Sequence, residues 1–221
     1  MLKRALFKIA RSPAAGAFIG FAFAHLTGLM PVEKLVENER AVVLRHPAPV
    51  GEVHWLGAPK MRLPSLAALD LADGETRACV TAVFQALALA AEGEGIRPYT
   101  ILVNGGAYQD VPQIHFHLLQ DGMAYEPVLP PGNEVGWAYG QAVAYPHPRS
   151  DESFHVIIAV NAPSAPLPAL DLAQPAAQAQ LLDCLALAQQ VAARQNMTAF
   201  RLLTYCGYAT VDPGLTFHLM G

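Results

Sequence analysis

The chain has 221 residues, of which 53% are hydrophobic and 14% charged, and its formal net charge is −4. Four of its 14 basic residues (Lys3, Arg4, Lys8 and Arg11) lie in the first eleven positions, so the remainder carries 10 basic against 18 acidic groups, or −8. An acidic body argues against a nucleic-acid-binding protein, because such proteins need clustered Lys and Arg to displace counterions from phosphate.

Residues 1–31 form an apolar extension in which no charge occurs between Arg11 and Glu33. A stretch of about 20 uncharged residues is at the lower limit for crossing a bilayer. Four interpretations stay open: a cleaved signal, a membrane helix, a targeting peptide, or a helix packed on protein. We expect a retained helix that docks on a protein partner or lies in a membrane surface. The expected location is therefore the cytoplasm or an organelle matrix, with membrane association through this segment.

The next part of the chain predicts four strands and one helix in the order β-β-α-β-β. The strands are expected at 41–45, 53–58, 99–104 and 113–119, and the helix at 74–92. Apolar residues recur along the helix at i, i+3, i+4, i+7 and i+11 from Val80. Asp73 is a suitable N-cap, and Gly93 and Gly95 are suitable terminators.

The same pattern recurs from residue 142 to the C-terminus. A gapless shift of 101 positions aligns His46 with His147, His54 with His155, and Phe116-His117-Leu118 with Phe217-His218-Leu219. The second helix is expected to open at Pro175 and to stop at Asn196. Duplication is the best interpretation.

Hairpins that alternate with one long helix per repeat predict an α+β fold, with antiparallel sheets covered by helices on one side. We expect an N-terminal extension at 1–31, a first unit at 32–120, a Pro/Gly-rich linker at 121–141 and a second unit at 142–221. Aromatic residues in the linker predict that it packs against the body.

The chemistry is concentrated between residues 104 and 120. In a strand, Gln113, His115 and His117 would share one face while the residues between them enter the core. Just upstream, Asn104-Gly105-Gly106 predicts a flexible turn whose amides can approach a phosphate.

This segment resembles the signature of the histidine-triad (HIT) superfamily, and the segment from Met30 to Lys60 resembles the lead-in of such domains. The resemblance implies two HIT-like units fused in one chain as a pseudo-dimer. It also implies nucleotide chemistry, with His115 as the nucleophile that attacks the α-phosphate and His117 and Asn104 as phosphate or nucleotide contacts. Gln113 would act as a positioning group, and Gly105 and Gly106 would lie against the nucleotide.

Three positions depart from the family pattern. Gln113 replaces the first histidine of the triad, and Asp110 stands where many members have a small hydroxyl residue. His46 falls where many members have an acid that grips the ribose, so we retain both His46 and Asp110 as candidate nucleotide contacts. Together these departures predict either an unusual substrate or lost catalysis.

The two repeats differ at one informative position, since Thr216 replaces His115. An imidazole can act as a nucleophile near neutral pH and an unassisted threonine cannot, so chemistry is expected in the first unit only.

The other histidines have structural interpretations. The repeated spacing favours ring nitrogens bonded to backbone for the aligned pairs at 46/147 and 54/155, and His218 would be a vestige or a seam residue. Lys60 could meet phosphate, although a solvated lysine is the expected state. A zinc ion on His115 and His117 lacks an obvious third ligand, so neither a metal nor a cofactor is expected.

The three cysteines have no CxxC spacing and predict buried, reduced thiols (Cys79, Cys184 and Cys206). The leading hypothesis is a nucleotidyl hydrolase or transferase that acts on a nucleotide or nucleotide conjugate. The alternative is a non-catalytic nucleotide-binding or structural subunit docked through residues 1–31.

Overall fold

The structure is a computed structural model that describes residues 33–120, 135–148, 150, 152–208 and 214–221. The N-terminal extension expected at 1–31 therefore lies outside the described residues. Within the described ranges, no helix is long and apolar enough to cross a membrane.

Among the described residues, each half of the chain contributes five strands and one long helix. The first half contains β1 (Lys34–Glu37), β2 (Ala41–Arg45), β3 (Val53–Pro59), α3 (Gly74–Gly93), β4 (Tyr99–Gly106) and β5 (Phe116–Gln120). The second half contains β6 (Trp137–Tyr139), β7 (Ala142–Pro146), β8 (His155–Val160), α4 (Pro175–Arg194), β9 (Ala199–Cys206) and β10 (Thr216–Met220). Short 3-10 turns at Leu66–Ala68 and Leu167–Ala169 precede the two helices.

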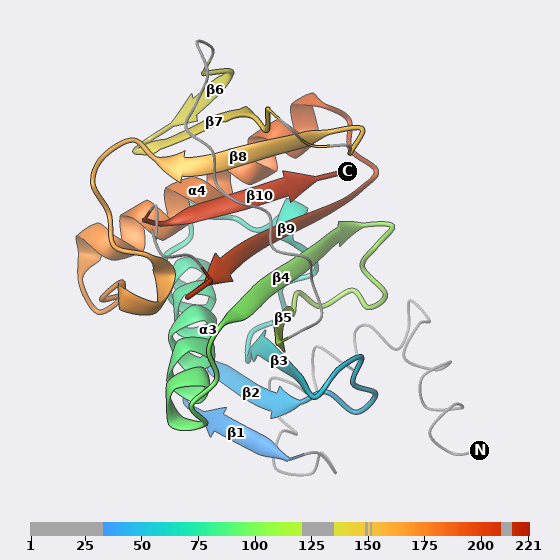
Figure 1. Cartoon of the computed structure of the whole chain (residues 1–221), viewed down its shortest axis with the longest axis vertical. Helices are drawn as coiled ribbons and strands as arrows, with labels where there is room; N and C mark the ends of the chain where they lie inside the picture. The colour runs from blue at the N-terminus through green and yellow to red at the C-terminus, as the bar shows by residue number, and fades with distance from the viewer. Residues whose placement is uncertain (1–32, 121–134, 149, 151, 209–213) are drawn as a thin grey trace.

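All ten strands form one antiparallel sheet in the order β1-β2-β3-β5-β4-β9-β10-β8-β7-β6 (Figure 1). Read outward from the centre, both halves follow the same order of equivalent strands. The two halves meet at β4 and β9, which are paired from Tyr99↔Cys206 to Gly106↔Ala199. The α+β class and the pairing of two equivalent units in one sheet are thus confirmed.

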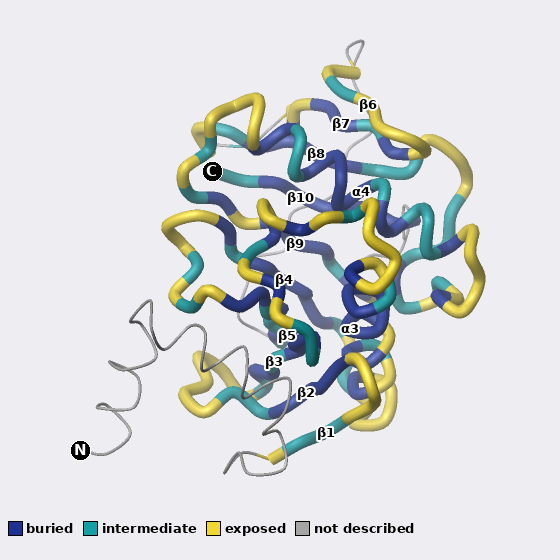
Figure 2. Tube along the Cα trace, turned by 180° about the vertical axis from the view of Figure 1, so that it is seen from behind, coloured by how far each residue is buried: buried dark blue, intermediate teal, exposed yellow. Residues whose placement is uncertain are grey.

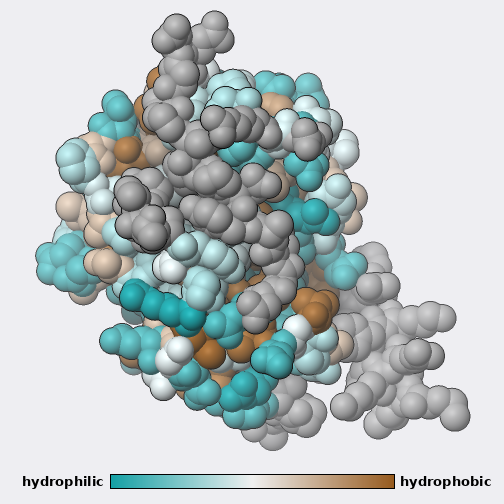
Figure 3. All heavy atoms as spheres, viewed as in Figure 1, coloured by the Kyte–Doolittle hydropathy of each residue, from teal (hydrophilic) through white to brown (hydrophobic). Residues whose placement is uncertain are grey.

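Both helices cover the same face of the sheet, as Figure 2 shows from the helical side. They share one core with inward-facing strand residues such as Ile101, Val103 and Leu118. The alternate residues form a smaller apolar cluster on the opposite face, around Leu102 and Leu203. Figure 3 views this opposite face, where brown apolar atoms are visible over the lower half of the sheet.

The local signals at the helix ends are confirmed. Asp73 Oδ2 accepts a hydrogen bond of 2.7 Å from the Thr76 amide, which satisfies a donor that the first helical turn leaves unpaired. Asn196 has φ of 51°, a left-handed conformation that an asparagine tolerates and that ends α4.

The structure differs from the sequence prediction at the start of one strand and in the presence of two short strands. Strand β5 begins at Phe116 and not at residue 113, so the strand alternation does not extend back to Gln113. Strands β1 and β6 were not predicted, because four and three residues are too short to show a periodicity. The segment predicted as a linker contains β6, whose Trp137 ring lies 6.5 Å from that of Phe154.

The glycines after Asn104 have a different role from the flexible turn that was predicted. They end β4 and pack against the second half of the chain. A Cβ on Gly105 would lie 2.2 Å from the Phe200 ring, and one on Gly106 would lie 2.0 Å from the Thr198 carbonyl oxygen. The absence of side chains here allows β4 and β9 to approach closely at the centre of the sheet.

Candidate functional site

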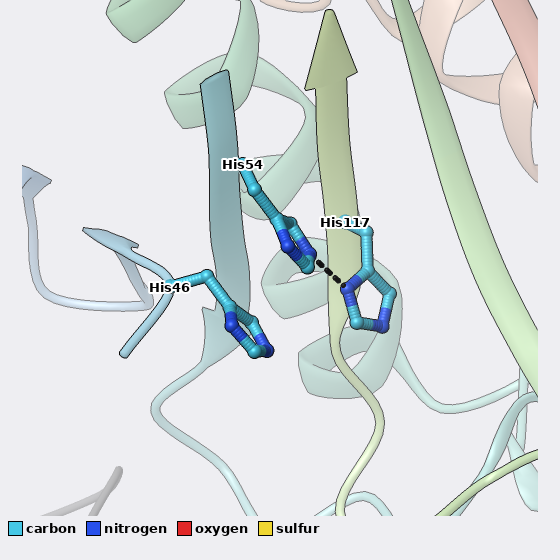
Figure 4. Close-up of side chains that lie close together, drawn as sticks. All are labelled: His46, His54 and His117. Atoms are coloured by element: carbon cyan, nitrogen blue, oxygen red, sulfur yellow. Dashed lines mark hydrogen bonds between the residues drawn. The ribbon is translucent and has the colours of Figure 1, made fainter. Parts of the chain in front are cut away.

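The candidate site lies on the sheet face opposite the helices. His117 in β5 pairs with Leu56 of β3 and Leu102 of β4, and His54 in β3 pairs with Leu119. His46 directly follows β2 and joins the same group. The three imidazoles lie side by side in Figure 4, with His54 between His46 and His117 in the view.

A chain of hydrogen bonds fixes the tautomers of two of these histidines. The Val50 amide donates to His54 Nδ1 at 3.3 Å, so the proton of the neutral His54 ring is on Nε2. That Nε2 lies 2.8 Å from His117 Nδ1 and donates to it (Figure 4). The proton of neutral His117 is therefore on Nε2, and this buried atom has no hydrogen-bond partner among the described residues. The site thus presents an N–H donor without an acceptor.

His115 has a tautomer of its own, set by the backbone. Its Nδ1 lies 2.8 Å from the carbonyl oxygen of Gln113, which can only accept, so Nδ1 carries the proton. The lone pair of the ring is then on Nε2. The side chain is partly exposed, and its ring centroid lies 4.9 Å from that of His117 at an interplanar angle of 67°.

Burial lowers the pKa of these imidazoles by disfavouring their charged form. The pKa of His54 falls to about 4 and that of His117 to about 3, with the neighbouring histidines as a further cause. Burial also lowers the pKa of His115, against smaller opposing effects of the Gln113 hydrogen bond and of Asp110. These rings are therefore neutral at pH 7, the state in which an imidazole nitrogen can attack an electrophile.

His46 stacks on His54, with ring centroids 3.9 Å apart and an interplanar angle of 6°. Its Nδ1 accepts a 3.0 Å hydrogen bond from the Ala48 amide, which leaves the proton of the neutral ring on Nε2. The backbone contacts expected for His46 and His54 are present, but the structure also brings both rings to His117.

The proximity of three imidazoles raises the question of a metal ion. One nitrogen from each of His46, His54 and His117 lies within 4.8 Å of the others, and His147, His155 and His218 form an equivalent group. An imidazole binds a metal through a lone pair in its ring plane, and one ion cannot lie in the planes of two parallel stacked rings. The described rotamers therefore do not form a three-histidine metal centre in either half.

The second unit retains the imidazoles but closes the site. His147 stacks on His155 at 4.3 Å, and His155 Nε2 lies 2.9 Å from His218 Nδ1, as in the first unit. Thr216 replaces the candidate nucleophile, and the Tyr205 ring lies 5.2 Å from the His218 ring at the position equivalent to Asn104. His218 is 0% exposed, whereas His117 is partly exposed.

The other predicted site residues are distributed unevenly. Gln113 is fully buried, where it accepts from the Leu63 amide at 3.3 Å and donates to the Met61 carbonyl at 3.0 Å. It therefore holds the loop after β3 and does not line an open surface with the histidines. Asp110 is exposed in the loop that leads to His115.

Two side interpretations from the sequence can also be placed. Lys60 is not a freely solvated lysine, because its Nζ forms a 2.6 Å ion pair with Glu37. All three cysteines are buried thiols. A cavity of about 550 Å³ lies between the end of α3 and residues 167–173, and no histidine lines it.

Sequence reasoning missed the stacked arrangement of His46, His54 and His117. The available signal was the spacing of eight residues between His46 and His54, repeated between His147 and His155. In an antiparallel hairpin, such spacing can return the second residue to the side of the first. The His46 amide indeed donates to the His54 carbonyl oxygen at 2.8 Å.

Comparison with known proteins supports this description. Residues 28–122 match the HIT domain. An ADP-glucose phosphorylase from Arabidopsis thaliana, solved with bound ADP-glucose, is 12% identical, with 90% of this chain and 80% of that chain covered at a TM-score of 0.61. A GalT-like protein from the same plant is 11% identical over 90% of this chain and 81% of that chain, with a TM-score of 0.59.

A histidine triad protein from Clostridium difficile is 24% identical over 49% of this chain and 95% of that chain, with a TM-score of 0.42. No curated protein sequence matches the chain. The fold of the whole chain, with two equivalent units in one sheet, is similar to that of the ADP-glucose phosphorylase. The HIT domain match covers the first of these units.

Proposed function

We propose that the protein is a nucleotidyl hydrolase or transferase that acts on a nucleotide phosphate, with His115 as the nucleophile. One observation carries this proposal: the hydrogen bond from His115 Nδ1 to the Gln113 carbonyl leaves the lone pair on Nε2 of a partly exposed side chain. A neutral imidazole held in this tautomer can form a covalent intermediate without first losing a proton.

The reaction has two displacements. His115 Nε2 attacks the α-phosphorus, a P–N bond forms, and the bond from phosphorus to the leaving group breaks, with its electron pair going to the leaving group. An oxygen of water or of another acceptor then attacks the same phosphorus and loses a proton to solvent. The P–N bond breaks, and its electron pair returns to His115.

His117 supports this chemistry as a phosphate ligand. Its Nε2–H is buried without a partner, and an unpaired buried donor is costly until it meets an acceptor. A phosphate oxygen beside His115 would accept this hydrogen bond. Stabilising the charge that develops on phosphate oxygens is the larger part of catalysis in phosphoryl transfer.

The comparisons support a substrate class for this proposal. The HIT domain match and the ADP-glucose phosphorylase fold favour a nucleotide joined through its phosphate to a second group. We therefore expect a nucleoside phosphoramidate, a dinucleoside polyphosphate or a nucleoside diphosphate sugar. Asn104 is a proposed nucleotide contact, and His46 offers a second N–H donor.

The test is turnover of a panel of these three classes, with adenine and guanine bases, by the wild type and by His115→Ala. We expect turnover of at least one class by the wild type and its loss in the variant. Equal turnover by both proteins would refute the nucleophile assignment. Nucleotide binding without any turnover would support the alternative of a non-catalytic subunit.

Attachment through residues 1–31 is a separate proposal. The apolar composition of this segment supports docking on a membrane surface or on a protein partner. We expect deletion of residues 1–31 to move the protein from the membrane-pelleted fraction to the supernatant. An unchanged distribution would remove the segment as the anchor.

A further inference from the structure

One arginine of the second unit contacts the loop that leads to the candidate nucleophile of the first unit. Asn104 of β4 pairs directly with Arg201 of β9, so their side chains share a face of the sheet. The pairing of β4 with β5 runs from Thr100↔Leu119 to Leu102↔His117. His115 directly precedes β5, and Asn104 and Arg201 continue on the sheet face of His117 towards the end of β4.

The side chain of Arg201 is exposed and directed at the loop that carries His115. Its guanidinium carbon lies 4.7 Å from the ring centroid of Tyr108, which belongs to that loop. Stacking on an aromatic face holds the guanidinium plane while its N–H donors stay available at the edges. Among the residues that the structure describes, none forms an ion pair with Arg201.

Four basic side chains of the first unit have acidic partners. Lys34 and Lys60 pair with Glu37, Arg40 with Glu75, and Arg45 with Glu33 and Glu94. The exposed Asp110 in the same loop as Tyr108 adds a negative charge that would repel a phosphate. A cation on the site face would offset this charge, and Arg201 lies on that face.

We propose that Arg201 binds the substrate phosphate held at His115, so that the single active site is shared between the two units. This inference rests on the proposed function and adds a residue to it. Strand β5, which His115 directly precedes, lies two strand spacings of about 4.8 Å from β9, which carries Arg201. An arginine side chain and a phosphate between them can bridge that separation, with Tyr108 holding the guanidinium.

The experiment compares ligands with and without a phosphate. Binding of AMP, adenosine, GMP and guanosine is measured by titration calorimetry for the wild type, Arg201→Met, Arg201→Lys and Arg77→Met. The methionine retains an unbranched apolar stem on Tyr108 while it removes the charge. Arg77 is exposed near the start of α3, on the opposite side of the sheet. Arg77→Met therefore has the same net charge as Arg201→Met but leaves the site unchanged.

We expect Arg201→Met to weaken the monophosphate with measurable affinity by about 10- to 100-fold, the usual range for loss of a charge-assisted hydrogen bond. The matching nucleoside should bind within about twofold of wild type, and Arg201→Lys should recover part of the loss, because lysine keeps the charge without the planar fork. Arg77→Met should bind all four ligands as the wild type does.

Unchanged monophosphate affinity in Arg201→Met, or equal weakening of monophosphate and nucleoside, would overturn the role of Arg201 while the proposed function stands. Equal weakening by Arg77→Met would assign the effect to net charge and would also overturn it. A wild type that neither binds nor turns over any nucleotide would refute the proposed function, and the shared site with it. Thermal unfolding of each variant checks that it is folded. If Arg201→Met does not fold, Arg201→Lys tests the inference in its place.

Discussion

The two units of this protein keep the same pair of hydrogen-bonded histidines but differ in what surrounds it. In the first unit, His54 and His117 lie beside a partly exposed His115. In the second unit, His155 and His218 lie beside Thr216 and the ring of Tyr205. The histidine pair is therefore part of the scaffold, and the proposed reaction depends on the residue two positions before the second member of the pair.

The largest expected effect comes from substituting the residue at this position, which is His115 in the first unit and Thr216 in the second. His115→Asn should lower kcat by at least about 10³-fold, because the covalent intermediate cannot form without the imidazole. Thr216→Val at the equivalent position should leave kcat within twofold. Steady-state kinetics on one substrate would measure both, and a large loss from Thr216→Val would contradict the asymmetry of the units.

The close approach of the two units is tested by a glycine at their junction. Gly105→Ala would place a Cβ 2.2 Å from the Phe200 ring, so β4 and β9 must move apart. We expect a loss of about 3 kcal/mol in the free energy of unfolding, which is typical of an overpacked core site. Gly93→Ala, where the added Cβ meets no atom within 4 Å, is the matched control and should not destabilise. Urea unfolding would measure both.

The histidine pairs sharpen the comparison, because the same substitution can be made in each. His54→Phe removes the donor that fixes the tautomer of His117, and we expect kcat to fall about 10- to 100-fold, as for other groups that orient a reacting side chain. His155→Phe should leave kcat unchanged, and it should lower the unfolding temperature about as much as His54→Phe does. Equal kinetic losses in both variants would show that the second pair also supports the reaction.

The pH dependence of stability should reveal these buried rings. His54 and His155 each have a pKa lowered to about 4 in the folded protein, mainly by burial, while the unfolded value is near 6.5. Their stabilising effect is then complete above pH 6.5 and is lost as the pH falls towards 4, because the unfolded chain binds the protons first. One such ring lowers the free energy of unfolding by about 2 kcal/mol at pH 5.

Urea titrations between pH 7.5 and 4.5 would measure this loss, and His155→Phe should flatten the curve. A stability that is independent of pH over this range would contradict the buried neutral state of the rings.

The sequence predicted most of this fold because its signals were local and repeated. The helix ends at Asp73 and Asn196 depend on chemistry within one turn, and the match of the two halves required only their alignment. The role of Gly105 could not be predicted in this way, since its close neighbour Phe200 is 95 positions away and is brought near only by the pairing of β4 with β9.

The candidate site was predicted in part for the same reason. The pattern of alternating histidines identified His115 and His117, but it also assigned Gln113 to the same open face. Gln113 instead lies before the first residue of β5 and bonds to the loop at residues 61–63. The stacking of His46 on His54 depends on the turn between β2 and β3, whose geometry the composition alone does not define.

The most direct test is to locate the covalent intermediate. The wild type is mixed with a substrate that it turns over, quenched in alkali to preserve a phosphoramidate, digested, and mapped by mass spectrometry. The account predicts one nucleotidyl group on His115 and none on His117 or His218. A nucleotidyl group on another residue, or full turnover with none trapped at any quench time, would contradict it.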